Sequence, residues 1–353
     1  MIEILSDTIT KHGRIGGVLF QEAVDVTTRT EVGVSLLEDT LVKMYEQPKE
    51  FNLKEFDWLY YYFEEDEVEY LKIVYSNVVG TVDPQLLPSV MFRNLSPQIA
   101  HFMDNRGNPD ALEYGYNPIL FFERAEDPCS VGTRLAWKIF EFSDIAREIR
   151  DRLEIVTNSI REKVKEANGS NIKILLIAGG LAPAVFNLAR EFPNVTFQVD
   201  LVDINRNTLR HVSEIAAGHD NVSMNVHIGD ATKENFERKG RVLEIVDNYY
   251  DVIEAVGIND YFPEQLMINL LNTANRKVKA GGRIIIGNMS LTDEGYSKKK
   301  FIERVLCWPD MEHKDREEIE RIIINTLPNH KVRILQTSLS TVYVAVIDTA
   351  NSK

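Results

Sequence analysis

The sequence has little cysteine and no cluster of the residues that commonly hold transition metals. Its two cysteines, Cys129 and Cys307, lie far apart, and its seven histidines are scattered without an HxxxH pair. It contains no CxxC motif and no Cys/His cluster with metal-ligand spacing. Because structural zinc sites and redox pairs depend on such spacing, we expect no bound metal.

Long apolar runs and an excess of positive charge are also missing. No run of about 18 apolar residues occurs, and the opening MIEILSDTITKHGR lacks the apolar core of a secretory signal. We therefore expect no membrane partner and a cytoplasmic location. Lys and Arg number 40 against 54 Asp and Glu, a formal net charge of −14. The short run Lys298–Lys300 is no basic stripe, so we expect no nucleic-acid partner either.

Two regions of the chain differ in pattern, which predicts two domains. Residues 1–140 carry most of the aromatic clusters and should form a mainly helical domain that acts as a lid over the substrate. Within it, the Val- and Thr-rich stretch 16–34 is predicted to be β-like. Residues 141–353 should form the cofactor-binding domain, which begins with an amphipathic helix over 142–166 capped by Ser143. The N-terminal helices are expected over 35–47, 54–63, 66–79 and 85–104.

The C-terminal region alternates strand and helix signals. Strands are predicted over 172–177, 196–202, 222–228, 250–256, 283–289, 331–337 and 341–348. Helices between the first five strands are predicted over 182–191, 206–217, 236–247 and 263–279. This order implies parallel pairing with right-handed crossovers. Since only Ser338–Ser340 separates the last two strands, they should form an antiparallel hairpin. The predicted fold class is α/β, a Rossmann-like seven-stranded sheet with an antiparallel terminal hairpin.

A strand, a glycine turn, a helix and a second strand that ends in an acid occupy residues 172–203, IKILLIAGGLAPAVFNLAREFPNVTFQVDLVD. This is the pattern of a nucleotide-binding βαβ unit. Its glycines let the backbone approach a ligand, and Asp203 can accept both hydroxyls of a ribose. Leu181 and Pro183 would crowd a pyrophosphate at the helix N-terminus, which argues against NAD.

The order of elements over 170–348, with its terminal hairpin, resembles the class I S-adenosylmethionine (SAM)-dependent methyltransferases. In that family the loop after the first strand wraps the methionine part of SAM. Here the loop is Ala178–Pro183, with alanine at the first glycine position of GxGxG. The form IAGGLAP also resembles the loop of nicotianamine synthase-like SAM enzymes. The resemblance implies SAM as cofactor and methyl transfer to a small molecule by displacement at the sulfonium.

The same resemblance assigns residues at the ends of the first four strands to SAM. Asp203 would bind the ribose, and Asp230 after the third strand would lie beside the adenine amine. The alternatives are a plain strand–helix turn for the glycine loop and an N-cap role for Asp203. The residues expected to contact the cofactor are Ala178, Gly179, Gly180, Asp203, Ile204, Asp230, Ala231, Val256 and Gly257.

The loop after the fourth strand abuts the transferring methyl group in that family. An amine or alcohol acceptor would need a general base there, whereas a carboxylic acid or thiol would need little assistance. The catalytic candidates in this loop are Glu254, Asp260 and Tyr261. The candidates for holding the substrate are Tyr114, Tyr116, Asn288 and Ser290. Ordinary loop polarity, or core packing for the tyrosines, is the alternative for each.

The sequence leaves two other functions open. A nicotianamine synthase-like enzyme would transfer the aminocarboxypropyl arm of SAM, or cyclise it, and would leave methylthioadenosine instead of S-adenosylhomocysteine (SAH). A catalytically decayed scaffold would bind SAM without turnover, as the departure from GxGxG allows. The sequence does not decide the oligomeric state, so a homodimer stays an option.

Overall fold

The computed structural model describes residues 17–105, 109–167, 171–290, 299–308 and 311–350. It divides into two compact units, each assembled from separate stretches of the chain. Unit 1 contains Met1–Met103, Pro118–Asp144 and Lys300–Cys307, and unit 2 contains Asp104–Asn117, Ile145–Lys299 and Trp308–Lys353. The division into domains over 1–140 and 141–353 stays a prediction. None of the described helices is long and apolar enough to cross a membrane.

Unit 1 is built from helices, as predicted, but the expected β-like stretch 16–34 is wrong. From Gly17 onward this stretch is part of one long helix, α2. The buried side chains of Val34, Leu37 and Leu41 follow helical spacing, and this packing outweighs the β preference of Val and Thr. The elements of unit 1 are α2 (Gly17–Glu46), η1 (Leu53–Tyr61), α3 (Glu65–Val78), α4 (Leu87–Arg93), α5 (Pro97–Asp104), α7 (Leu120–Glu123), α8 (Val131–Phe142) and η4 (Phe301–Val305).

Unit 2 contains a seven-stranded sheet in the order β3-β2-β1-β4-β5-β7-β6. The first five strands pair in parallel, and β7 pairs antiparallel with both β5 and β6. This confirms the predicted sheet with its terminal hairpin, which is the fold of the class I SAM-dependent methyltransferases. The strands are β1 (Ile172–Ile177), β2 (Phe197–Asp203), β3 (Val222–Ile228), β4 (Tyr250–Ala255), β5 (Val278–Met289), β6 (Lys331–Gln336) and β7 (Val342–Asp348).

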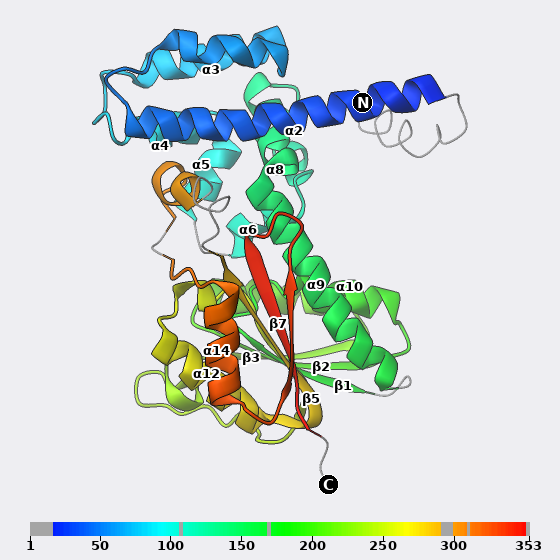
Figure 1. The fold of residues 1–353 in the computed structure, drawn as a ribbon. Coiled ribbons are helices and arrows are strands. Elements are labelled where there is room, and N and C mark those ends of the chain that lie inside the picture. The colour runs from blue at the N-terminus through cyan, green and yellow to red at the C-terminus, as the bar shows by residue number, and fades with distance from the viewer. Residues whose placement is uncertain (1–16, 106–108, 168–170, 291–298, 309–310, 351–353) are drawn as a thin grey trace. The chain divides into compact units, whose positions relative to one another are not determined.

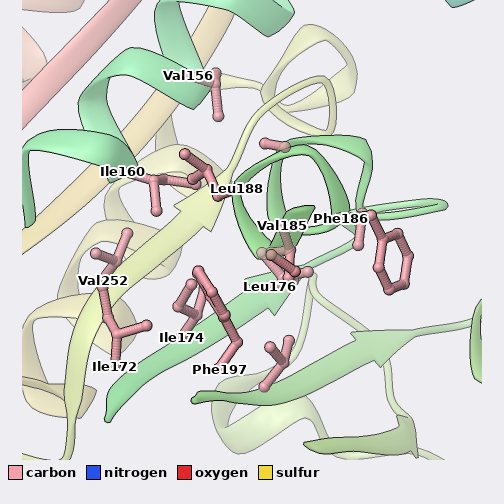
Figure 2. Close-up of a cluster of buried hydrophobic side chains, with 14 of the residues drawn as sticks. Val156, Ile160, Ile172, Ile174, Leu176, Val185, Phe186, Leu188, Phe197 and Val252 are labelled. Atoms are coloured by element: carbon pink, nitrogen blue, oxygen red, sulfur yellow. The ribbon is translucent and has the colours of Figure 1, made fainter. Parts of the chain in front are cut away.

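Helices cover both faces of this sheet (Figure 1). One face packs against α9 (Asp144–Glu166), α10 (Pro183–Glu191) and α11 (Arg206–Ala216). Figure 2 shows Ile174 and Leu176 of β1 among the side chains of α9 and α10 on this face. The next residues along β1, Leu175 and Ile177, lie in the opposite core, which α12 (Glu264–Lys277) and α14 (Arg316–Thr326) cover. Side chains alternate across a strand, so both faces of β1 are apolar.

The predicted helices over 142–166, 182–191, 206–217 and 263–279 are confirmed. The predicted helix over 236–247 is wrong. A short 3-10 turn, η2 (Glu234–Phe236), is followed by irregular backbone in which Lys239 and Gly240 have φ of 52° and 75°. The α-helix cannot contain such left-handed residues. The segment still buries Phe236 and Ile245, which explains its apolar pattern.

Helix α9 also holds the terminal hairpin by polar contacts. The buried carboxylate of Glu148 accepts hydrogen bonds from the backbone N–H groups of Leu339 at 2.8 Å and Thr341 at 2.9 Å, and from the hydroxyls of Thr337 and Thr341. Asp151 accepts another from the Ser338 N–H at 3.1 Å. These bonds satisfy backbone donors of the turn and fix its position between β6 and β7.

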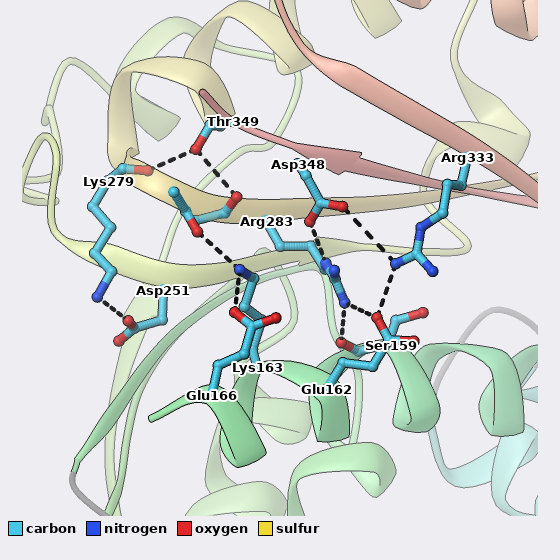
Figure 3. A network of polar contacts seen from close by, with 12 residues as sticks. Ser159, Glu162, Lys163, Glu166, Asp251, Lys279, Arg283, Arg333, Asp348 and Thr349 are labelled. Carbon is cyan, nitrogen blue, oxygen red and sulfur yellow. Dashed lines mark hydrogen bonds and ion pairs between the residues drawn. The ribbon is translucent and has the colours of Figure 1, made fainter. Parts of the chain in front are cut away.

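The opposite end of α9 is tied to the sheet through Arg283 of β5 (Figure 3). The Arg283 side chain is 4% exposed and pairs with Glu162 at 2.6 Å and Asp348 at 2.7 Å. It also donates to the Ser159 carbonyl at 2.7 Å. One guanidinium therefore joins α9, β5 and β7, since its planar fork can serve several acceptors at once.

Replacing Arg283 by Met should lower the free energy of unfolding by roughly 3 kcal/mol, because Asp348 and the Ser159 carbonyl lose a buried donor. The matched control is Arg161→Met on the same helix, since Arg161 pairs with Glu191 on the surface and should cost less than about 1 kcal/mol. Urea unfolding followed by circular dichroism measures both. Equal effects of the two changes would contradict the role given to Arg283.

Candidate functional site

The predicted site residues gather where β1 and β4 lie side by side. The helix after β1, α10, packs on one face of the sheet, and the helix after β4, α12, packs on the other. The two loops therefore leave the sheet in opposite directions at the carboxyl ends of the strands, where sheets of this kind bind their ligands. We call this place the crevice. Register places Leu176 of β1 opposite Glu254 of β4 at this point.

The turn after β1 has the left-handed backbone that the glycine pattern predicts, but alanines as well as a glycine adopt it. Ala178, Gly180 and Ala182 have φ of 53°, 57° and 53°. Gly179 between them has no room for a side chain, since an added Cβ would lie 2.8 Å from the Leu176 Cβ. Alanine at positive φ is strained by about 1 kcal/mol or more. The surrounding structure therefore holds this turn in its conformation.

Asp203 ends β2, as predicted, and its carboxylate is fixed by its own turn. The carboxylate accepts a hydrogen bond from the Asn205 N–H at 2.7 Å. Burial raises the pKa of Asp203, and the backbone N–H groups of Asn205 and Ile204 oppose that shift. The alternative that Asp203 caps the following helix is wrong, because Asn205 is the N-cap of α11. Ile204 is exposed, so its side chain is open to a ligand.

Asp230 follows β3, where the pattern GDA places it. Its carboxylate accepts hydrogen bonds from the Thr232 N–H at 2.9 Å and the Thr232 hydroxyl at 2.6 Å. Ala231 is half-buried against the core beside α12. Asp230 and Asp203 thus end neighbouring parallel strands at one edge of the sheet.

Glu254 lies near the end of β4, and its side chain is buried. It is 9% exposed, and its Oε1 accepts a hydrogen bond from the Val256 N–H at 2.8 Å. Its Oε2 lies 3.3 Å from the position a Cβ would take on Gly179. Burial raises the pKa of Glu254 to about 7, against opposition from the Val256 N–H and from Arg152.

Arg152 of α9 lies beside this carboxylate, and the sequence analysis did not single it out. Its Nη1 is 3.5 Å from Oδ2 of Asp260, and a Cβ added to Gly257 would lie 3.8 Å from the guanidinium nitrogens. Burial alone would lower the pKa of Arg152, but Tyr116 and Asp260 outweigh burial and raise it. The arginine is therefore charged and shared among several partners.

Asp260 has little free capacity for catalysis. Its Oδ1 accepts a hydrogen bond from the Met289 N–H at 2.7 Å, and its Oδ2 faces Arg152. Burial raises its pKa, while Arg152, the Met289 N–H and Lys314 oppose the shift. Both oxygens are engaged, so Asp260 joins the loop after β4 to α9 and to the end of β5.

Tyr261, in contrast, accepts a hydrogen bond through its hydroxyl oxygen. Trp308 donates its indole N–H to the Tyr261 hydroxyl at 2.5 Å. An indole N–H can only donate, so the tyrosine oxygen accepts here and its own proton stays available. Burial also raises the pKa of Tyr261, so the phenol stays protonated near neutral pH. Trp308 lies 47 residues along the chain from Tyr261, and no local motif could have pointed to this contact.

Two of the four predicted substrate residues lie in α6, and the other two lie at the end of β5. Tyr116 in α6 (Pro109–Tyr116) is half-buried and accepts a hydrogen bond from Arg152, whereas Tyr114 is buried. Asn288 and Ser290 at the end of β5 are each 1% exposed. Oxygen atoms of both have no partner in the described residues, but the segment around Glu312 covers them. A substrate would reach these oxygens only if that segment moved.

No family model matches this chain, and no curated protein matches it in sequence. Among solved structures, a possible exported protein from Bordetella parapertussis superimposes with a TM-score of 0.57 at 12% identity, over 81% of this chain and 96% of that one. The CurJ carbon methyltransferase reaches 0.47 at 13% identity over 94% of both chains. The SAM-bound magnesium protoporphyrin IX methyltransferase ChlM from Synechocystis PCC 6803 reaches 0.40 at 11% identity, over 59% and 85%. The first likeness shows a shared fold only, and TM-scores below 0.5 add nothing to it.

Stability should depend on pH through Glu254. Its pKa is about 7 when folded and 4.5 as the reference value, so the folded state binds more protons between those values. The contribution of Glu254 therefore falls by roughly 3 kcal/mol as pH rises through this range. Glu254→Gln should match wild type near pH 4.5 and be more stable by roughly that amount at pH 8.

Urea unfolding at several pH values measures the difference between the two proteins. Glu154→Gln on exposed α9 surface is the matched control and should show no pH-dependent difference. A difference between Glu254→Gln and wild type that stays constant with pH would show that folding does not raise the pKa of Glu254.

Proposed function

We propose that this chain is a SAM-dependent methyltransferase that acts on a small-molecule acceptor. The observation that carries the proposal is the set of groups gathered where the loops after β1 and β4 separate. There a left-handed turn without side-chain bulk at Gly179 lies among the acidic ends of β2, β3 and β4. A turn of this kind admits a ligand close to the backbone, and the acids suit a ligand with hydroxyls, an amine and a positive charge. SAM has all three.

The residues of the crevice fit SAM by their chemistry. Asp203 is held in place by backbone donors and keeps lone pairs for two ribose hydroxyls. Asp230, at the end of the adjacent strand, can accept from the adenine amine. Val256 and Gly257 continue from Glu254 at the end of β4, where Gly257 has a φ of 94°. This left-handed residue brings open backbone to the crevice.

The bound cofactor supplies an activated methyl group on its sulfonium. The protein therefore has to position the acceptor and keep water away. Tyr261 is the residue we assign to the acceptor, because no described residue accepts its phenol proton and Trp308 fixes its ring. As a donor, Tyr261 orients an acceptor through an oxygen or another atom with a lone pair. The raised pKa makes Tyr261 a poor general base near neutral pH.

Calorimetry with SAM, SAH and NAD tests the cofactor. SAM and SAH should bind and NAD should not. Incubation with SAM and a desalted metabolite mixture, followed by identification of the nucleoside, tests the reaction: SAH indicates methyl transfer, and methylthioadenosine would indicate transfer of the aminocarboxypropyl arm. Tight NAD binding without SAM binding would refute the proposal.

Asp203→Ala should weaken SAM binding by roughly 1.5–3 kcal/mol, because a charged acceptor for two ribose hydroxyls is lost. The fold should survive, since Asn205 and not Asp203 caps α11. Asp220→Ala, in the exposed turn before β3, is the matched control and should bind SAM as wild type does. Unchanged affinity of Asp203→Ala in calorimetry would remove Asp203 from the cofactor site.

Tyr261→Phe should lower turnover by roughly 10²-fold if its proton orients the acceptor in the transition state, with little change in SAM affinity. Turnover is measured as SAH formation with the metabolite mixture, and affinity by calorimetry. Tyr61→Phe, with a 74% exposed side chain in unit 1, is the control and should be silent. If Tyr261→Phe has the turnover of wild type and Tyr261→Ala has a lower turnover, the ring alone matters and the assignment of the phenol proton is wrong.

A further inference from the structure

The turn after β1 has no acidic residue of its own. Residues 172–183, IKILLIAGGLAP, contain one lysine and no Asp or Glu. The carboxylate that reaches this turn comes from the neighbouring strand, since Glu254 of β4 lies opposite Leu176 in the parallel register. The distance of 3.3 Å from its Oε2 to the Cβ position on Gly179 places this oxygen directly against the turn.

The two oxygens of Glu254 differ in their contacts. Oε1 accepts the Val256 N–H at 2.8 Å, which sets the orientation of the carboxyl group. Oε2 accepts no hydrogen bond from the described residues. A carboxylate oxygen without a donor can accept a hydrogen bond from a charged group of a ligand, and such a bond favours the ionised form.

The groups that face Glu254 leave its charge incompletely balanced. On α9, Arg152 is the nearest cation, but it also serves Asp260 of the loop after β4 and Tyr116 of α6. Ile285 of β5, the register neighbour of Glu254 in β4, is apolar. The turn after β1 offers backbone alone. Burial therefore prevails over Arg152 in raising the pKa of Glu254 to about 7.

We propose that Glu254 binds a positively charged group of SAM and gives up its proton when the cofactor arrives. The inference rests on the proposed function. It adds that Glu254 is part of the cofactor site and that cofactor binding releases its proton. The proton passes from the carboxyl group to the solvent, and the carboxylate then pairs with the incoming cation. No bond of the cofactor changes in this step.

Calorimetry in two buffers of different ionisation enthalpy, phosphate and Tris, measures the protons released on binding. With SAM as the probe, wild type should release close to one proton near pH 6 and fewer protons as the pH rises. Affinity should weaken as pH falls below 7, by at most about tenfold per pH unit. SAH repeats the titration without the sulfonium. Release with SAH as well assigns the ammonium group as the partner, and release with SAM alone assigns the sulfonium.

Glu254→Gln should bind SAM more weakly than wild type, release no proton and lose the pH dependence of affinity. Glu154→Gln, an exposed change on α9, should behave as wild type in all three respects. Binding of SAM by wild type without proton release at any of these pH values would overturn the inference and leave the proposed cofactor intact. Proton release that persists in Glu254→Gln would also overturn it. Failure of both SAM and SAH to bind wild type would instead refute the proposed function.

Discussion

The parallel pairing of β1 with both β2 and β4 is the constraint on which the site depends. β1 lies inside the sheet and is apolar on both faces, and the helices that follow β1 and β4 cover opposite sides. Their connecting loops separate at the strand ends, in the place we call the crevice. Every charged group assigned to the cofactor lies on one of these ends, because a polar side chain further down the strand would be buried in one of the two cores.

Helix α9 connects this crevice with the rest of unit 2. Its apolar face contributes Val156 and Ile160 to the core of Figure 2. Its polar residues make three separate attachments: Glu148 to the hairpin turn, Arg152 to the crevice and Glu162 to the network of Figure 3. A helix fixed at both ends can hold a buried arginine in a defined place, which a mobile side chain on a loop could not do.

The sequence predicts most of this fold because strand and helix periods are local signals. Strand ends also carry the site, so Asp203 and Asp230 could be found from their positions after apolar runs. Arg152 and Trp308 could not, since their partners lie 108 and 47 residues away and no spacing rule connects them. The helix expected over 236–247 failed for a related reason: apolar residues recur there, but Lys239 and Gly240 adopt left-handed backbone.

Among the three catalytic candidates, burial and hydrogen bonding separate roles that residue type alone leaves equal. Both oxygens of Asp260 are engaged in contacts within the protein. The Tyr261 hydroxyl can still donate its proton, and one oxygen of Glu254 can still accept a hydrogen bond.

The central claim is that SAM binds across the ends of β1, β2, β3 and β4. A crystal structure of the complex with SAH tests it most directly. The account predicts the ribose at Asp203, the adenine at Asp230 and a positively charged group of the amino-acid arm at Glu254. SAH bound elsewhere, or with these residues untouched, would contradict it.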